Sequence, residues 1–140
     1  MNGRSNIMLE SLRIAPDGSH HLLDGMPLYK ARFQGVQSFH DPGIAAVHDE
    51  SGAFHIDLEG REMYRHRYLT TYGYYYERAA VKEEGKWFHI DLKGAAAYNE
   101  RFSWVGNFQE GTCPVRAHDG AFYHVDLSGN RLYKDSYSYV

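Results

Sequence analysis

The stretch FHIDLEG at residues 54–60 decides the fold, because nearly the same seven residues return as FHIDLKG at 88–94 and as YHVDLSG at 123–129. The histidines of the three stretches lie 34 and 35 residues apart. Self-similarity at a fixed period of this size is typical of chains that repeat one small structural unit. The sequence therefore predicts a tandem-repeat architecture.

A second pattern raises the predicted number of units to four. A Tyr followed four residues later by Phe or Tyr recurs at the same period, at Tyr29/Phe33, Tyr64/Tyr68, Tyr98/Phe102 and Tyr133/Tyr137. We expect one domain over residues 1–140, with units at about 9–43, 44–77, 78–111 and 112–140. The first unit keeps a His and a closing Gly at 18–25 but lacks the His-x-Asp alternation, as terminal repeats often diverge.

Each unit is predicted to contain a β-hairpin. Apolar and polar residues alternate strictly in 54–58, 88–92 and 123–127, which indicates half-buried strands with Phe, Ile and Leu facing the core and His and Asp facing solvent. The following Asp-Leu-x-Gly fits a type I turn, in which Asp accepts hydrogen bonds from the turn backbone two residues on. Ahead of each strand, a Val-led segment ends in a Gly-containing turn, as a hairpin requires.

The aromatic pairs mark a corner after each hairpin. Their four-residue spacing places two rings on one face of a helical turn, but the segments are too short for a stable helix, so we expect a single turn or an irregular corner. Arg32, Arg67 and Arg101 precede the second ring, and each could stack on a ring or reach a carbonyl. A third strand is expected through 68–75 and through 102–108.

These patterns predict an all-β chain of tandem antiparallel β-hairpin repeats in an open or loosely closed array. The alternative is a small closed β-propeller-like ring, formed if the apolar lead at 7–14 pairs with Tyr137–Val140, which matches Phe102–Val105. Closure would remove exposed strand edges, whereas an open array permits edge-to-edge self-association. We favour the open array, because four short units leave little room for a propeller channel.

Composition narrows the partners and the compartment. The chain has 140 residues and a net charge of -3 with both signs scattered, so no basic footprint for nucleic acid is present. No apolar stretch approaches the roughly 20 residues of a membrane-spanning helix, and no secretory leader is apparent. Cys113 is the single cysteine, so no intrachain disulfide is possible. We expect a cytoplasmic protein that binds neither nucleic acid nor membrane.

The third unit resembles a known repeat family. Residues 85–94, GKWFHIDLKG, resemble the core of the WG or KWG repeat, a Gly-Lys-Trp-Gly-Tyr/His-Ile-Asp-x-x-Gly stretch, and 98–111 resembles its aromatic corner and approach to the next unit. The resemblance covers nearly the whole chain from about Leu9. In this unit Phe88 replaces the family's second Gly, and only here is the family's Trp present, as Trp87. The resemblance implies a bacterial β-rich repeat module, often attached to other domains including enzymes, without a common catalytic activity.

The residues offer one catalytic alternative. His55, His89 and His124, each two residues before an Asp, could line up as a ladder that binds zinc or another divalent ion, in a metal-binding or hydrolytic protein. Successive units are widely spaced and the Asp residues have a turn role, so we expect structural histidines. Cys113 lacks a motif that lowers a thiol pKa, and no phosphate loop, nucleophile elbow or zincin helix occurs. We therefore predict no enzyme activity, catalytic residue, metal or cofactor.

Binding is the favoured function. The densest aromatic stretch is TTYGYYY at 70–76, whose successive rings point to opposite faces of a strand, so some should be exposed. With Trp104 at the corresponding corner of the next unit, Tyr72, Tyr74 and Tyr75 are predicted to form an aromatic surface for an unknown protein or peptide. Packing of these rings between units is the alternative. The sequence thus favours a non-catalytic protein-interaction or scaffold module, which could be an accessory to an enzyme domain.

Overall fold

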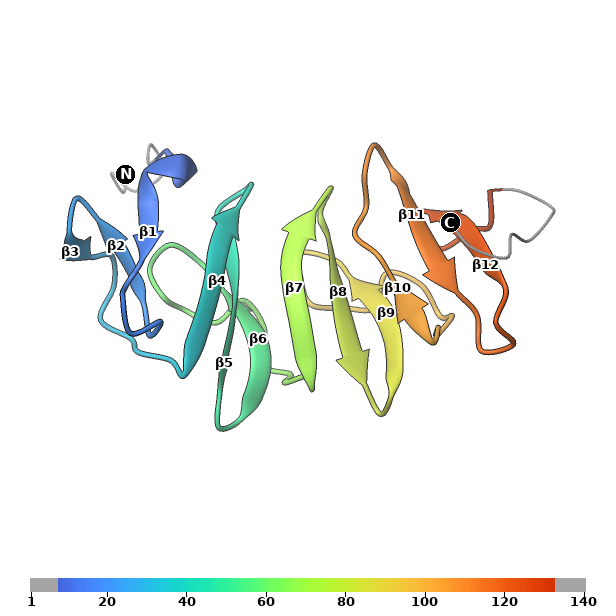
Figure 1. Cartoon of the computed structure of the whole chain (residues 1–140), viewed down its shortest axis with the longest axis horizontal. Coiled ribbons are helices and arrows are strands. Elements are labelled where there is room, and N and C mark those ends of the chain that lie inside the picture. Colours follow the sequence, from blue (N-terminus) through green and yellow to red (C-terminus); the bar gives the residue numbers. More distant parts are fainter. Residues whose placement is uncertain (1–7, 133–140) are drawn as a thin grey trace. The chain divides into compact units, whose positions relative to one another are not determined.

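The structure, a computed structural model, describes residues 8–132 and is built of strands (Figure 1). One 3-10 turn, η2 (Leu9–Ser11), precedes the first strand. The strands are β1 (Leu12–Ile14), β2 (His21–Leu23), β3 (Met26–Pro27), β4 (Gly35–His40), β5 (Ile44–Asp49), β6 (Gly52–Ile56), β7 (Thr70–Tyr75), β8 (Arg78–Glu83), β9 (Lys86–Ile90), β10 (Trp104–Val105), β11 (Thr112–Arg116) and β12 (Phe122–Asp126).

The strands form four three-stranded antiparallel sheets, in the orders β1-β2-β3, β4-β5-β6, β7-β8-β9 and β10-β11-β12. No described sheet closes into a barrel. The predicted fold class, an all-β chain of tandem hairpin units, is confirmed. The predicted lead does contain a strand, β1, but its proposed ring-closing partner, Tyr137–Val140, lies outside the described residues.

The chain divides into two compact units, Met1–Gly73 and Tyr74–Val140. The boundaries of the sheets and of the sequence repeats differ by one strand. β4, for example, falls in the first predicted repeat, whereas its sheet partners β5 and β6 fall in the second. Each of the last three sheets thus takes its first strand from one repeat and its hairpin from the next.

The hairpins share one register. In β5–β6 the pairs are Ala45↔Ile56, Ala46↔His55 and Val47↔Phe54, and in β8–β9 they are Ala79↔Ile90, Ala80↔His89 and Val81↔Phe88. A small residue therefore lies opposite each histidine. In β11–β12 the residue opposite His124 is Pro114, whose carbonyl accepts from the backbone N–H of Gly106 at 2.9 Å.

The turn after each hairpin is held by its aspartate. Oδ1 of Asp57 accepts from the backbone N–H of Glu59 at 2.9 Å and of Arg61 at 3.0 Å. Asp91 and Asp126 make the same two bonds, which confirms their predicted role. The closing Gly60 has a φ of 79°, and a Cβ there would lie 2.8 Å from the Tyr29 ring. Turn geometry and close packing both require glycine at this position.

The three corners within residues 8–132 are irregular, as predicted, and an arginine closes each of them. Nη1 of Arg101 donates to the carbonyls of Tyr98, Asn99 and Glu100, and its guanidinium lies 3.7 Å from the centre of the Phe88 ring. Arg67 and Arg32 bind three corner carbonyls in the same way, and Arg67 also covers Phe54. The arginine takes up carbonyls that a helix would otherwise satisfy, while its flat group stacks on the ring.

Strands β6 and β9 are buried on both faces around their histidines, whereas His124 on β12 is only partly buried. The burial in β6 and β9 corrects one prediction. The histidines were expected to face solvent, but His55 and His89 are fully buried, and so are Phe54 and Ile56 on either side of His55. The alternation of apolar and polar residues was interpreted as a strand with one buried face and one solvent-exposed face. A histidine with both nitrogens bonded can be buried as readily as its apolar neighbours.

Candidate functional site

The buried histidines form a repeated arrangement that we call the histidine clamp. In the second repeat, Nδ1 of His55 lies 2.6 Å from the Tyr64 hydroxyl and Nε2 lies 2.8 Å from the carbonyl oxygen of Tyr72. A carbonyl only accepts, so Nε2 carries the proton and Nδ1 accepts from the tyrosine hydroxyl. The clamp thus joins a hairpin strand to its own corner and to β7, the first strand of the following sheet.

The same clamp occurs in the neighbouring repeats. His89 lies between the Tyr98 hydroxyl at 2.6 Å and the Gly106 carbonyl at 2.9 Å. His21 lies between the Tyr29 hydroxyl at 2.6 Å and the Gln37 carbonyl at 2.7 Å. The tyrosine at the matching place for His124 is Tyr133, which lies outside the described residues.

The sequence predicted no role for His21, because Leu23 stands where the other repeats have the turn aspartate. A second spacing could have found it. Each clamp tyrosine follows its histidine by eight or nine residues, and Tyr29 follows His21 by eight. The first repeat therefore lost the turn residue of the motif but kept the clamp.

Burial keeps the clamp uncharged. Desolvation lowers the pKa of His55 and of His89 to about 4, although the bonds to the Tyr72 and Gly106 carbonyls act in the opposite direction. It also lowers the pKa of His21 and raises the pKa of Tyr29 to about 12. Near neutral pH each clamp is consequently a pair of neutral side chains, suited to packing rather than to proton transfer.

The clamp engages the side-chain atoms that the proposed metal ladder would need as ligands. Both nitrogens of His55 and of His89 already have partners, and Asp57 binds its turn backbone and Arg61, with Oδ2 3.2 Å from Nε. Within residues 8–132, no three His, Cys, Asp or Glu side chains are grouped so that they could hold a metal ion. A metal would have to displace the tyrosine or the carbonyl that each imidazole bridges.

Cys113 lies beside the clamp of His89. Its Sγ is fully buried, donates to the Gly106 carbonyl at 3.1 Å and lies 3.6 Å from Nε2 of His89. Burial raises the pKa of the thiol to about 12. At neutral pH the side chain is therefore a thiol and not the thiolate that a nucleophile requires.

The predicted aromatic surface is divided by burial. Tyr72 is 46% exposed and Trp104 is 41% exposed, whereas Tyr75 is partly buried. Tyr74 is only 1% exposed and its hydroxyl donates to the carbonyl of Asp91 at 2.6 Å, so it belongs to the core and cannot join a surface. Tyr72 and Trp104 belong to different compact units, and their predicted shared surface stays a prediction.

Leu69, which the sequence analysis did not single out, is the most exposed large apolar side chain of the described residues, at 71%. It lines a hollow of about 310 Å³ in the first compact unit, together with residues of β4, β5, β6 and β7 that include Val47, His48 and Ala53. Leu69 directly follows Tyr68, which is buried, and nothing in the local sequence indicated that Leu69 itself would be exposed. Leu69 and Tyr72 thus place two exposed apolar groups within one short segment.

Comparisons with known proteins bear on the fold alone. No family model and no curated protein match the chain, so the WG-repeat resemblance stays a prediction. Among solved structures, 90% of the chain is similar to the computationally designed Ika8 protein, with a TM-score of 0.58 and 15% identity, and it spans 45% of that chain. The computationally designed Ika4 protein matches with a TM-score of 0.53 and 16% identity, over 82% of each chain.

One structural finding concerns membranes. No helix in residues 8–132 is long and apolar enough to cross a bilayer.

Proposed function

We propose that the chain is a non-catalytic protein-interaction or scaffold module built of WG-like repeats, which works in the cytoplasm as an accessory to other domains. The observation that carries this proposal is the exposed pair Leu69 and Tyr72, 71% and 46% exposed at the start of β7. The side chains that could act in catalysis, namely the clamp histidines and Cys113, are buried and hydrogen-bonded to their neighbours.

Leu69 and Tyr72 offer two separate contacts for a partner, because Leu69 lines a hollow and Tyr72 does not. Tyr supplies a large rigid ring with a polar tip, and such residues carry much of the binding free energy at protein interfaces. The hollow beside Leu69 has an apolar wall, with Val47 and Ala53, and polar groups from His48 and Asp49. It suits one apolar side chain of a partner protein or peptide, with a hydrogen-bonding neighbour.

A capture experiment with single variants tests the proposal. The full chain and its Tyr72→Ala and Leu69→Ser variants are immobilised, and bound proteins from a bacterial lysate are compared by quantitative mass spectrometry. We expect a specific protein to be retained by the wild type and depleted at least about tenfold by either variant, a loss of about 1.4 kcal/mol.

Tyr76→Ala is the matched control, because Tyr76 is 55% exposed but lies in the tight turn that follows β7, within the second compact unit. It should leave capture unchanged. Equal capture by the wild type, Tyr72→Ala and Leu69→Ser, with all three folded by circular dichroism, would contradict the proposal.

A further inference from the structure

A hollow of about 410 Å³ lies in the first compact unit, lined by residues of η2, β1, β2 and β4. Sites for small molecules in proteins span about 300–1,000 Å³. β1 and β4 are neighbours (Figure 1), and Ile14 of β1 lines the hollow. Ile14 pairs with His21 as Ala46 pairs with His55, yet Ile14 is 39% exposed whereas Ala46 is fully buried. The hollow therefore leaves open a position that is covered in the next sheet.

The inner part of the hollow is apolar. Leu12 and Phe39 are buried there, and the ring centre of Phe39 lies 4.4 Å from that of His21. His21 offers no free nitrogen, because Nδ1 and Nε2 bind the Tyr29 hydroxyl and the Gln37 carbonyl. This part of the hollow therefore suits an apolar group, since a polar one would lose its hydrogen bonds to water.

One wall of the hollow, His40, is held in place. Its ring lies against Gly73 of β7, so close that a Cβ at that position would overlap it. A wall that is already fixed lowers the entropy that a ligand must lose on binding.

Arg13 brings a fixed positive charge to the hollow. Its Nη1 donates to the backbone carbonyls of Glu10 at 2.7 Å and of Leu12 at 2.9 Å, which holds the guanidinium beside the η2 turn. Within residues 8–132, Nε and Nη2 of Arg13 donate no hydrogen bond. A planar guanidinium with free donors binds a carboxylate through two parallel hydrogen bonds. The free side of Arg13 therefore suits a carboxylate.

Two carboxylates, those of Glu10 and Asp41, line the same hollow. Both side chains are exposed, and in the part of the chain that the structure describes neither forms an ion pair with Arg13. A simple anion would be repelled by the two carboxylates, and a simple amine by Arg13. A ligand that carries both a carboxylate and an ammonium group complements all three charges.

We propose that this hollow binds a free α-amino acid with an apolar side chain. The carboxylate of the ligand pairs with Arg13, its ammonium group with the two carboxylates, and its side chain with the apolar inner part. Exposed charge pairs contribute little each, so we expect a dissociation constant of about 0.1–1 mM. Neither Leu69 nor Tyr72 lines this hollow, so the inference goes beyond the proposed function and does not depend on it.

A titration of the isotope-labelled full chain with L-leucine, followed by nuclear magnetic resonance, tests the proposal. We expect saturable shifts of the backbone amides of β1 and β4. N-acetyl-leucine lacks the ammonium charge, leucinamide lacks the carboxylate, and glycine lacks the apolar side chain, so each should bind at least about tenfold more weakly. Equal binding of any of them overturns the proposal. So does the lack of a saturable shift with leucine, phenylalanine or methionine up to about 20 mM.

Two variants identify the groups that recognise the charges. Arg13→Gln should bind leucine at least about tenfold more weakly and lose the preference for leucine over leucinamide. Asp41→Asn should reduce the preference for leucine over N-acetyl-leucine, because only Glu10 then faces the ammonium group. A purely structural role of either residue would weaken all ligands alike and leave both preferences unchanged, which overturns the proposal.

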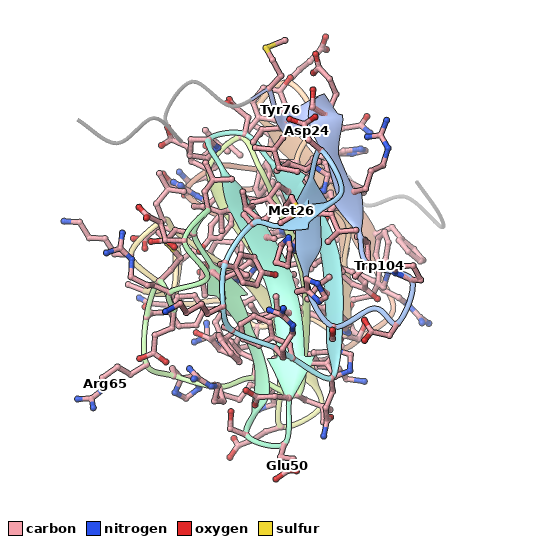
Figure 2. All side chains as sticks on the ribbon, turned by 90° about the vertical axis from the view of Figure 1, so that its left-hand side faces the viewer. Asp24, Met26, Glu50, Arg65, Tyr76 and Trp104 are labelled. Carbon is pink, nitrogen blue, oxygen red and sulfur yellow. The ribbon has the colours of Figure 1, made fainter. Side chains whose placement is uncertain are left out.

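Arg65→Gln and Glu50→Gln are the matched controls. Both side chains are exposed in the first compact unit and point away from the strands (Figure 2), and neither lines the hollow. Both variants should bind leucine as the wild type does. A loss of leucine binding in Arg65→Gln equal to that in Arg13→Gln would overturn the proposal, because the net charge of the chain and not the hollow would then hold the ligand.

Discussion

The strand histidines and the turn aspartates of the repeated motif stand two residues apart and do different work. Asp91 bonds to the backbone of Lys93 and Ala95, two and four residues on. His89 bonds to Tyr98 and Gly106, nine and 17 residues on. The aspartate therefore shapes one turn, whereas the histidine joins a hairpin to a corner and to the following strand. The comparison predicts that the histidine matters more for stability.

Removal of a clamp histidine should give the largest effect. His89→Ala leaves the Tyr98 hydroxyl and the Gly106 carbonyl without their imidazole partner and opens a cavity between them. We expect a loss of about 3–5 kcal/mol in the free energy of unfolding, measured by urea denaturation. His118→Ala is the control, because His118 is exposed, and it should cost less than about 0.5 kcal/mol. Similar losses for both variants would show that His89 is not a clamp.

Acid should weaken the same contacts. The pKa values of His55 and His89 are about 4 in the folded chain, against an ordinary value of about 6.5 for histidine, so the unfolded chain binds protons first as the pH falls. Stability is fully present above about pH 6.5 and should fall between pH 6.5 and pH 4, by a few kcal/mol per histidine. Urea midpoints across this range check the fall.

A variant separates the clamp from other titrating groups. His55→Gln cannot be protonated in this range, so its stability should depend less steeply on pH than that of the wild type. Parallel pH curves for the two proteins would mean that His55 does not cause the acid loss.

The sequence predicted the contacts between residues that are close along the chain and missed those between residues that are far apart along it. Asp57 and Gly60 specify a turn through bonds that span a few residues, and the Arg67 corner is equally local. The burial of His55 depends on Tyr64 and on the carbonyl of Tyr72, 17 residues away, which no local pattern encodes. The alternation was read correctly as a strand, but its second face was assigned to solvent.

The candidate site was predictable only in part for the same reason. Tyr72 and Tyr74 stand on one strand, two residues apart, and the sequence treats them alike. The structure leaves Tyr72 46% exposed and buries Tyr74, whose hydroxyl binds the Asp91 carbonyl. Leu69 was missed because no local pattern shows that it lines a hollow together with residues of β4, β5, β6 and β7.

Loss of one clamp hydroxyl should have an intermediate effect. Tyr64→Phe keeps the ring, which lies 5.7 Å from that of His55, but removes the hydroxyl 2.6 Å from Nδ1. A buried nitrogen left without its partner costs about 1–3 kcal/mol in the free energy of unfolding. Tyr76→Phe, at an exposed tyrosine, should cost much less. If Tyr64→Phe is as stable as the wild type, the hydroxyl bond contributes no net stability.

The turn aspartate should give the smallest effect. Asp91→Ala removes the acceptor for the backbone N–H groups of Lys93 and Ala95. Both groups lie in an exposed turn where water can replace the carboxylate, so we expect a loss of about 0.5–1.5 kcal/mol in urea denaturation. Asp91→Asn keeps an acceptor oxygen and should recover most of the loss, because asparagine forms the same kind of turn. A loss equal to that of His89→Ala would remove the distinction between local and distant bonds, since the carboxylate would then support more than its own turn.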